Sequence, residues 1–135
     1  MGNGRTDMNK ASVHRRSDAE VLFKKQRFRG AMYMAGYAVE CKLKAALMFA
    51  HHAITLEELE AKLGSDLKIH SLERLASRFL GRTRVPPSVE LKKNWGIVRA
   101  WSVAWRYDRE LDDPDVAAQF LRSVDWVLRW LENNA

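Results

Sequence analysis

The sequence lacks the features that would cross-link the chain, anchor it in a membrane or build it from strands. Cys41 is the one cysteine, which excludes a disulfide within the chain, and its apolar neighbours indicate a small core residue rather than a nucleophile. The longest apolar run is too short, and too interrupted by glycine and lysine, to span a bilayer. No strand-like alternation, repeat or low-complexity tract occurs. Because no segment resembles a signal peptide, we expect a cytoplasmic protein.

The sequence also lacks the common catalytic and ligand-binding motifs. The segment 81–87 has no lysine followed by serine or threonine, so it is not a phosphate-binding loop. His51 and His52 are adjacent and would point in different directions on a helix, and neither has a histidine or carboxylate four residues on. We therefore expect no metal and no cofactor. Any enzyme chemistry has to come from arginine, histidine and tyrosine.

The chain does have enough apolar material for a core, and its charge is unevenly spread. Its 135 residues are expected to form one domain, because a chain of this length buries roughly two thirds of its unfolded surface. We predict a disordered arm at 1–9 and a single helical domain at 10–134. Residues 1–44 carry ten Lys and Arg against four Asp and Glu, whereas residues 111–135 carry two against five. This asymmetry favours an anionic partner on one face; for the basic cluster at 24–29, a solvated helix junction is the alternative.

The stretch Arg27–Ala50 is the centre of the predicted fold. From 31 to 39 it has no charged residue, and apolar or small side chains cover every side of a helical projection, which predicts a buried helix. Each glycine inside a helix costs about 1 kcal/mol relative to alanine, so Gly30 and Gly36 indicate a packing requirement. One stripe at helical spacing contains Tyr33, Tyr37, Glu40 and Lys44. The last two form an i,i+4 pair in the favourable orientation.

Caps and turns predict the bounds of the other helices. The first helix begins between Lys10 and Asp18, and a capping box at 17–20 either starts it or lies inside it. We place the break before the central helix at 27–30. The next segments are a short helix from Thr55 to about Leu63, a helix from Leu72 to a C-cap at Gly81, and a helix over Ser88–Tyr107 after a proline loop at 82–87. After an acidic loop at 108–113, Asp113 or Asp112 caps the last helix, with Pro114 at its first position.

The two C-terminal helices each have an apolar face. In the helix over 88–107 this face contains Leu91, Trp95, Val98, Trp101 and Trp105, and the edge stripe contains Arg99 and Arg106. In the last helix the residues expected to face the core are Val116, Phe120, Val124, Val127 and Leu131. The pattern predicts an all-α, up-and-down bundle of four long helices plus one or two short helices.

The run at 30–47, GAMYMAGYAVECKLKAAL, resembles the second helix of the HEPN family, the higher eukaryote and prokaryote nucleotide-binding domains. That helix carries an A-G-Y-x-x-E-x-x-x-K core, which is matched here by Ala35, Gly36, Tyr37, Glu40 and Lys44. The segments His70-Ser71-Leu72, opening one helix, and Arg106-Tyr107, closing a Trp-rich one, also fit the family layout. The likeness covers most of the chain from about Arg16 onward and implies a HEPN-like helical bundle.

The resemblance also raises the question of ribonuclease activity. Many HEPN proteins are metal-independent ribonucleases that use an arginine followed, four to six residues later, by a histidine at a dimer interface. The arginine stabilises developing phosphorane charge and the histidine moves protons. Arg106 stands in the place of that arginine, but the following YDRELDDPD contains no histidine. Asp108 or Glu110 in its place would repel phosphate, and Tyr107 does not correspond to the tyrosine that toxins of the family carry after the histidine.

We therefore expect a nucleotide- or RNA-binding dimerisation domain that lacks the usual ribonuclease motif, and no enzyme activity. Two alternatives remain: an atypical metal-independent endoribonuclease toxin using Arg106 with His70 or a carboxylate, or a structural protein–protein adaptor. His70 is otherwise a structural residue at the start of its helix. The candidate ligand-binding residues are Glu40, Lys44, Arg99, Arg106 and Tyr107. For Glu40 and Lys44 the alternative is a structural pair.

Trp126 and Trp130 fall off the predicted core face of the last helix, beside Arg122. Two tryptophans and an arginine on one stripe are typical of an interface, so we expect a homodimer that buries them. Alternatively, the short helix after Thr55 covers these rings and the chain is a monomer. The resemblance agrees with dimerisation. It also implies a separately encoded nucleotidyltransferase partner in a toxin–antitoxin or defence pair.

Overall fold

The computed structural model describes residues 4–64, 71–80, 88–107 and 112–134, and for Leu80, Arg106 and Tyr107 it describes the backbone alone. The elements in order are α1 (Arg5–Lys24), α2 (Phe28–Ala50), α3 (Leu56–Leu63), α4 (Leu72–Leu80), α5 (Val89–Val98), the 3₁₀ helix η2 (Val103–Tyr107) and α6 (Pro114–Asn134). The all-α bundle is confirmed. In this part of the chain no helix combines the length and the apolar character that crossing a bilayer requires.

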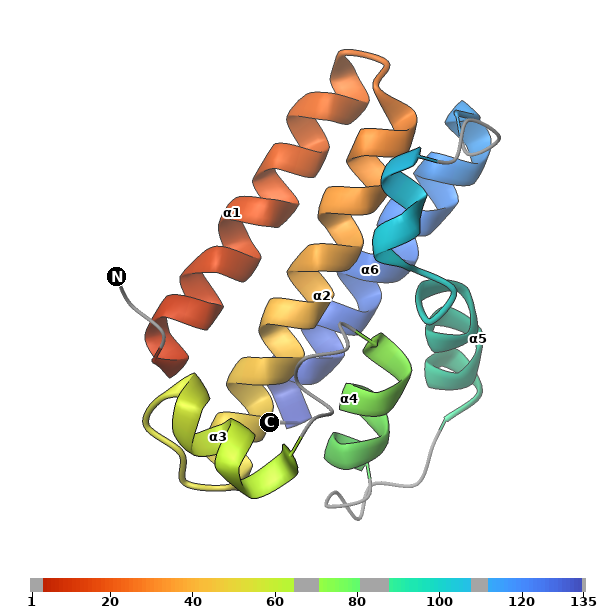
Figure 1. The fold of residues 1–135 in the computed structure, drawn as a ribbon. Helices are drawn as coiled ribbons and strands as arrows, with labels where there is room; N and C mark the ends of the chain where they lie inside the picture. The colour runs from red at the N-terminus through yellow and green to blue at the C-terminus, as the bar shows by residue number, and fades with distance from the viewer. Residues whose placement is uncertain (1–3, 65–70, 81–87, 108–111, 135) are drawn as a thin grey trace.

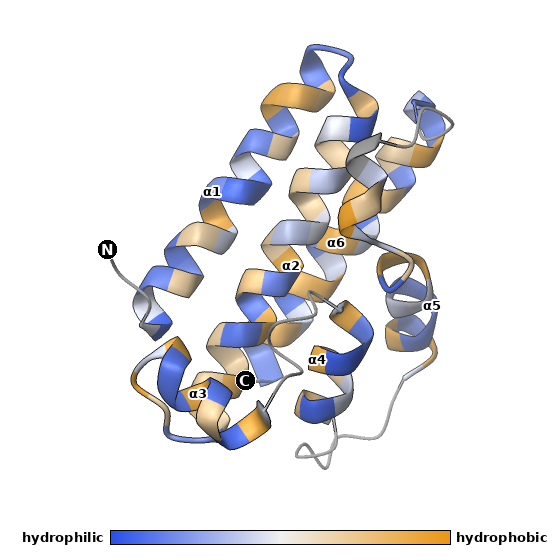
Figure 2. Ribbon diagram, in the orientation of Figure 1, coloured by the Kyte–Doolittle hydropathy of each residue, from blue (hydrophilic) through white to orange (hydrophobic). Residues whose placement is uncertain are grey.

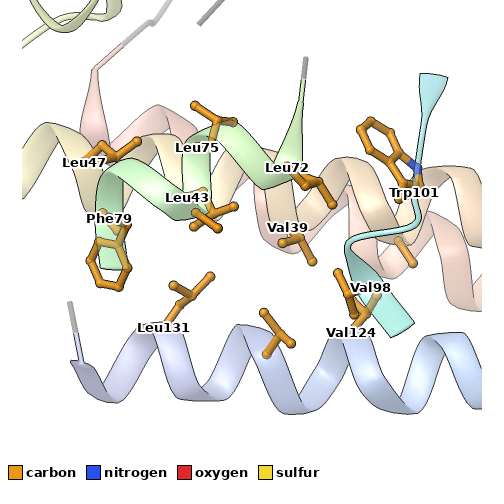
Figure 3. Packing of buried hydrophobic residues seen from close by; sticks show 14 of the residues in the cluster. Val39, Leu43, Leu47, Leu72, Leu75, Phe79, Val98, Trp101, Val124 and Leu131 are labelled. Atoms are coloured by element: carbon orange, nitrogen blue, oxygen red, sulfur yellow. The ribbon is translucent and has the colours of Figure 1, made fainter. Parts of the chain in front are cut away.

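Helix α2 lies at the centre of the bundle and packs against most of the other elements (Figure 1). It has α1 along one flank and α4, η2 and α6 on the other, with α5 packed against α6. The predicted central burial is confirmed, because thirteen residues of α2 are buried. Figure 3 shows leucines of α2 meeting Leu75 and Phe79 of α4 on one side and Leu131 of α6 on another.

The first helix begins at Arg5, well before the predicted window, so the prediction of a disordered arm at 1–9 is wrong for residues 5–9. Two contacts made by the preceding residue explain the early start. The Gly4 N–H donates to the Asp7 carboxylate at 3.1 Å, and Gly4 forms an isolated backbone bridge with Thr55. The capping-box residues at 17–20 consequently lie inside the helix. The remainder of the predicted arm, 1–3, lies outside the described residues.

The turn between α1 and α2 occupies 25–27 rather than the predicted 27–30. The Arg27 N–H donates to the Leu22 carbonyl at 2.8 Å, and the Gln26 N–H donates to the Phe23 carbonyl at 3.0 Å. This pair of bonds is a Schellman motif, which requires a left-handed residue after the C-cap. Gln26 is that residue, with φ of 61°.

The cap predicted at Thr55 is confirmed, and the structure adds serine caps at the starts of α4 and α5. The Thr55 hydroxyl accepts from the Glu58 N–H at 3.2 Å and starts α3, and the Ser71 hydroxyl accepts from the Arg74 N–H at 3.2 Å and starts α4. Ser88 caps α5 by accepting from the Leu91 N–H at 3.0 Å. The predicted C-cap at Gly81 and the loop at 82–87 lie outside the described residues.

The single helix predicted over Ser88–Tyr107 is wrong, because α5 ends at Val98 and η2 begins at Val103. Between them, Trp101 is buried against α2 (Figure 3). The turn is stabilised by the Trp101 N–H, which donates to the Val98 carbonyl at 3.0 Å. A continuous helix would keep residues 99–102 in helical register, so inserting this large side chain into the core requires the interruption.

Helix α6 begins as predicted with Pro114, and the cap is Asp113, whose carboxylate accepts from the N–H groups of Asp115 and Val116. Four of the five residues predicted to face the core are buried: Phe120, Val124, Val127 and Leu131. Val116 is the exception, because its side chain is 47% exposed while its neighbour Ala117 is fully buried. Ala117 lies closer to the direction of Phe120 and Val124 on the helix, so it fills the inward position instead.

Candidate functional site

The predicted stripe on α2 is an aromatic cluster that continues into a pair of charged residues. The rings of Tyr33 and Tyr37 lie 6.1 Å apart in an edge-to-face arrangement. The Trp101 ring lies 5.9 Å from Tyr33 and 6.3 Å from Tyr37. Both tyrosines are partly buried and pack against the core. The three rings therefore form one cluster where the segment between α5 and η2 crosses α2.

Gly36 makes this crossing possible. A Cβ atom at position 36 would lie 2.0 Å from a ring atom of Trp101, far inside van der Waals contact. The Trp101 indole N–H donates to the Tyr33 carbonyl at 3.0 Å, which satisfies the buried donor. The glycine predicted to have a packing role thus accommodates an indole ring. The Trp101 ring packed on Gly36, together with the hydrogen bond to Tyr33, fixes the start of η2 against α2. We call this arrangement the Trp101–Gly36 contact.

One turn further along α2, Glu40 and Lys44 form an ion pair. The Lys44 ammonium lies 3.2 Å from the Glu40 carboxylate, and their side chains are 12% and 1% exposed. A carboxylate this deeply buried is not presented to a ligand at the surface. Removing one partner of a buried pair typically costs about 3–5 kcal/mol, because the remaining charge stays buried. The geometry favours the structural interpretation for Glu40, while Lys44 retains a small accessible surface.

Helix α1 contributes a cation to the cluster. The Arg15 guanidinium lies over the Tyr37 ring, 5.3 Å from its centroid, a distance within the range of cation–π attraction. Burial raises the pKa of Tyr37, and the nearby Glu40 carboxylate raises it further. Tyr37 therefore remains a neutral hydrogen-bonding phenol at physiological pH.

Cys41 lies next to Glu40 in the sequence and is buried, as predicted for a small core residue. Burial raises the pKa of its thiol to about 11. Because the thiolate is the nucleophilic form, such a pKa excludes an activated cysteine at neutral pH. Among the described residues there is also no group of three or more His, Cys, Asp or Glu side chains arranged to hold a metal ion.

The other predicted ligand residues come from the α5–η2 region. Arg99 follows the end of α5, and its guanidinium lies 3.7 Å from the Glu73 carboxylate of α4, with both side chains largely exposed. Arg106 and Tyr107 belong to η2, which packs against α2. Since α5 and η2 are separate helices, Arg99 and Arg106 do not share the predicted helical stripe. The side chains of Arg106 and Tyr107, and all of His70, lie outside the described residues.

A groove with a volume of about 510 Å³ lies elsewhere, between α1 and α6. Arg16 crosses it and binds Asp125 through two hydrogen bonds of 2.6 and 2.9 Å. The hydrogen bond to Asp125 also raises the pKa of Arg16. At one end Lys42 donates to Asn9 at 3.0 Å. These charged groups bind one another across the groove, so they are already engaged within the protein.

The predicted interface residues differ in how they pack. Trp126 and Trp130 are both partly buried against the core. The Trp130 ring makes an edge contact with Phe79 of α4, with ring centroids 6.1 Å apart. It is therefore α4, not the short helix after Thr55, that covers Trp130. Arg122 is exposed on the outer side of α6.

Two contributors to the cluster were not identified as site residues from the sequence. The helical pattern places Trp101 only on a core face, and no local pattern singles out Arg15. Gly36 was the signal for a close approach, although nothing in the sequence says which residue approaches. Arg15 reaches Tyr37 through the pairing of two helices, which leaves no local pattern in the chain.

The geometry defines a class of protein: a helical bundle built around a central helix of small residues, with an aromatic and charged stripe beside a short crossing segment. A family model described as the HEPN domain matches residues 8–134. Since this match covers nearly the whole chain, the protein belongs to the HEPN domain family. No curated protein and no solved structure matches the chain.

Proposed function

We propose that this protein is a cytoplasmic, dimerising HEPN module that binds RNA or nucleotides without cleaving RNA. Family membership supports a nucleotide- or RNA-related role. The observation that carries the proposal is the aromatic cluster of Tyr33, Tyr37 and Trp101, with Arg15 over one ring and Lys44 one turn away. Tyr33 and Tyr37 are only partly buried, whereas Trp101 is buried and supports them. Partly exposed aromatic rings stack with bases, and adjacent cations attract phosphates.

The proposed ligand contacts come from the two sides of this cluster. Arg106 and Tyr107 on η2, with Arg99 before it, are the candidates on one side, and Lys44 is the candidate on α2. Glu40 acts through Lys44, because its carboxylate accepts from the ammonium at 3.2 Å while remaining buried. The Trp101–Gly36 contact supports this assignment, since it holds the start of η2 beside the tyrosines.

The absence of cleavage follows from the chemistry after Arg106. No histidine occurs between Arg106 and Val116, and this segment contains five Asp or Glu residues. Without a group that exchanges protons near neutral pH, an arginine alone stabilises charge but does not activate the ribose hydroxyl. Carboxylates in its place repel the phosphate that they would have to approach.

The test of this point is incubation of single-stranded RNA with the purified protein in EDTA. We expect full-length RNA at the end, as in a protein-free control. Cleavage that is lost in both Arg106→Ala and His70→Ala variants would establish the ribonuclease alternative and overturn the proposal.

A second test separates a binding module from a structural adaptor. Fluorescence anisotropy of a labelled RNA, titrated at several salt concentrations, should show binding whose affinity falls steeply with salt, because phosphate contacts release counterions. The Arg106→Gln variant should bind more weakly, while Lys93→Gln on the outer side of α5 should bind like the wild type. Absence of wild-type binding at low salt would favour the adaptor.

The proposed homodimer uses the outer face of α6. Arg122 and Trp126 are its main candidates, and Trp130, which is partly buried against Phe79, contributes less. Sedimentation of wild type and of Trp126→Glu tests this, because the substitution should produce a folded monomer. A monomeric wild type contradicts the proposed homodimer.

The proposed toxin–antitoxin or defence pair has its own test. A tagged chain should co-purify with a nucleotidyltransferase encoded by a neighbouring gene. If the two proteins do not associate when they are co-expressed, the proposed pair is contradicted.

A further inference from the structure

The turn between α1 and α2 presents an unusual concentration of positive charge. From 21 to 39 the chain contains no Asp or Glu, and its basic residues in this range are Lys24, Lys25, Arg27 and Arg29. We call these four the basic corner. The first three are exposed, and the fourth is partly exposed. Within the described parts of the chain, none of the four forms an ion pair, whereas Arg15, Arg16, Lys42 and Lys44 all do.

The basic corner is held by a fixed backbone rather than by a loose loop. The Schellman bonds from Gln26 and Arg27 close the end of α1. Beneath them the rings of Phe23 and Phe28 pack edge to face, with centroids 5.4 Å apart. A fixed backbone reduces the conformational entropy that the main chain loses when the corner binds a partner. The packing also turns these two rings toward one another, so they are not displayed as anchors for a membrane surface.

The basic corner is continuous with the aromatic cluster. Arg29, Tyr33 and Tyr37 follow one another at intervals of four residues in α2, so they lie along one side of the helix, about 6 Å apart. Arg15 of α1 covers the far end of this line. Basic side chains therefore lie at both ends of a line of two tyrosines along one side of α2. Alternating basic and aromatic groups are the arrangement that binds single-stranded nucleic acids.

The surroundings limit where a polyanion approaches. The start of α6, with Asp112, Asp113 and Asp115, lies toward the same end of the bundle as the basic corner, on the other flank of α2 (Figure 1). These carboxylates repel phosphate, and the Asp113 carboxylate is already bound to the first N–H groups of α6. A phosphate backbone is therefore directed over the α1 side of the corner.

We propose that the basic corner binds the phosphate backbone of single-stranded RNA and leads the strand along Arg29 to Tyr33 and Tyr37. This extends the proposed function, on which it rests, by adding an entry surface at one end of the molecule. The corner supplies attraction that depends on charge but not on base sequence, and the tyrosines supply stacking. Each phosphate neutralised on a single strand contributes about −0.7 to the slope of log affinity against log salt.

The experiment compares two variants that each lose four positive charges. The corner variant carries Lys24→Gln, Lys25→Gln, Arg27→Gln and Arg29→Gln. The control variant carries Lys10→Gln, Lys92→Gln, Lys93→Gln and Arg129→Gln, all at exposed positions away from the corner. Both are first compared with wild type by thermal unfolding. If the corner variant is unfolded, the Lys24→Gln, Lys25→Gln double variant replaces it, with Lys92→Gln, Lys93→Gln as its control.

Anisotropy of a labelled single-stranded RNA is then measured from low to moderate salt. For the corner variant we expect at least about tenfold weaker binding at low salt. Its slope of log affinity against log salt should be less steep than that of the wild type by about 2 to 3, or by about 1.4 for the double variant. Each control should retain most of the wild-type affinity and slope. Equal losses in corner and control variants overturn the inference, because they indicate attraction by net charge alone. RNA binding that is unchanged, with loss of self-association in sedimentation, overturns it in favour of a protein contact. Wild-type protein that does not bind RNA overturns the proposed function as well.

Discussion

The two flanks of α2 are built on different principles, although the helices packed on them have similar lengths. Helix α1 places only two buried residues against α2, Ser12 and Ala19. Helix α6 has seven buried residues, including Phe120 and Leu131. Figure 2 shows the same contrast, since α1 is mostly hydrophilic along its length. The α1 flank is therefore a close contact between small residues in which few side chains are fully buried, and the α6 flank is the hydrophobic core.

Polar bonds add to the packing of α1. The Ser12 hydroxyl donates to the Ala38 carbonyl at 2.8 Å, which satisfies a buried hydroxyl. Arg16 binds Asp125 across the groove to α6 at 2.6 Å. A bridge between partly exposed charges typically contributes no more than about 1 kcal/mol. Helix α1 is thus held by close packing of mostly small residues and by weak polar bonds, whereas α6 is held by the burial of large apolar side chains.

The largest expected effect comes from the α6 flank. Leu131→Ala removes a fully buried side chain and should lower the free energy of unfolding by about 2–5 kcal/mol. On the α1 flank, Val13 is 67% exposed, and Val13→Ala should change stability by no more than about 0.5 kcal/mol. Urea denaturation of both variants measures the contrast. Similar losses for the two would show that α1 buries more than the structure indicates.

The next effect compares the two glycines of α2. Gly36→Ala brings a Cβ to 2.0 Å from the Trp101 ring and should cost about 1–3 kcal/mol, because the indole must move. At Gly30 a Cβ would meet Leu22 of α1 at 3.5 Å, an ordinary contact, so Gly30→Ala should gain up to about 1 kcal/mol from helix propensity. Chemical denaturation gives both values. A Gly36→Ala protein as stable as the wild type would contradict the Trp101–Gly36 contact.

The flanks should also differ in how readily they open. Amide hydrogens in the middle of α1 should exchange at least about tenfold faster than those in the middle of α6, a difference of about 1.4 kcal/mol in opening free energy. Native-state hydrogen exchange by NMR measures both helices in one sample. Equal protection of α1 and α6 would indicate that they open together as one unit.

The smallest effect concerns the turn that joins α1 to α2. Gln26 adopts a left-handed conformation with φ of 61°, which disfavours any residue except glycine. Gln26→Gly should therefore raise the free energy of unfolding by up to about 1 kcal/mol. His52 has a similar φ of 55° after α2, so His52→Gly serves as a matched test. Thermal unfolding that shows both variants to be less stable would contradict the assignment of strain.

Local patterns predicted the parts of the fold that depend on neighbours in sequence. The burial of α2, the caps at Thr55 and Asp113, and Pro114 at the start of α6 all follow from residues within one or two turns. Long-range contacts decided the rest. The early start of α1 involves a bridge from Gly4 to Thr55, and the interruption after α5 depends on the space above Gly36.

The candidate site was predictable to the same extent. The stripe of Tyr33, Tyr37, Glu40 and Lys44 could be read directly from helical spacing. The contribution of Arg15 could not, because it depends on the pairing of α1 with α2. The burial of Glu40 could not be derived from the sequence either. A charged residue near the end of an apolar run gives the same sequence pattern whether its side chain faces solvent or a neighbouring segment.

The most direct test of the account is photocrosslinking of a single-stranded RNA containing 5-iodouridine, followed by mass spectrometry of the crosslinked peptides. The proposed function predicts crosslinks at Tyr33 or Tyr37, together with RNA of full length in the complex. Crosslinks confined to the outer faces of α5 and α6, or shortened RNA in the complex, would contradict it.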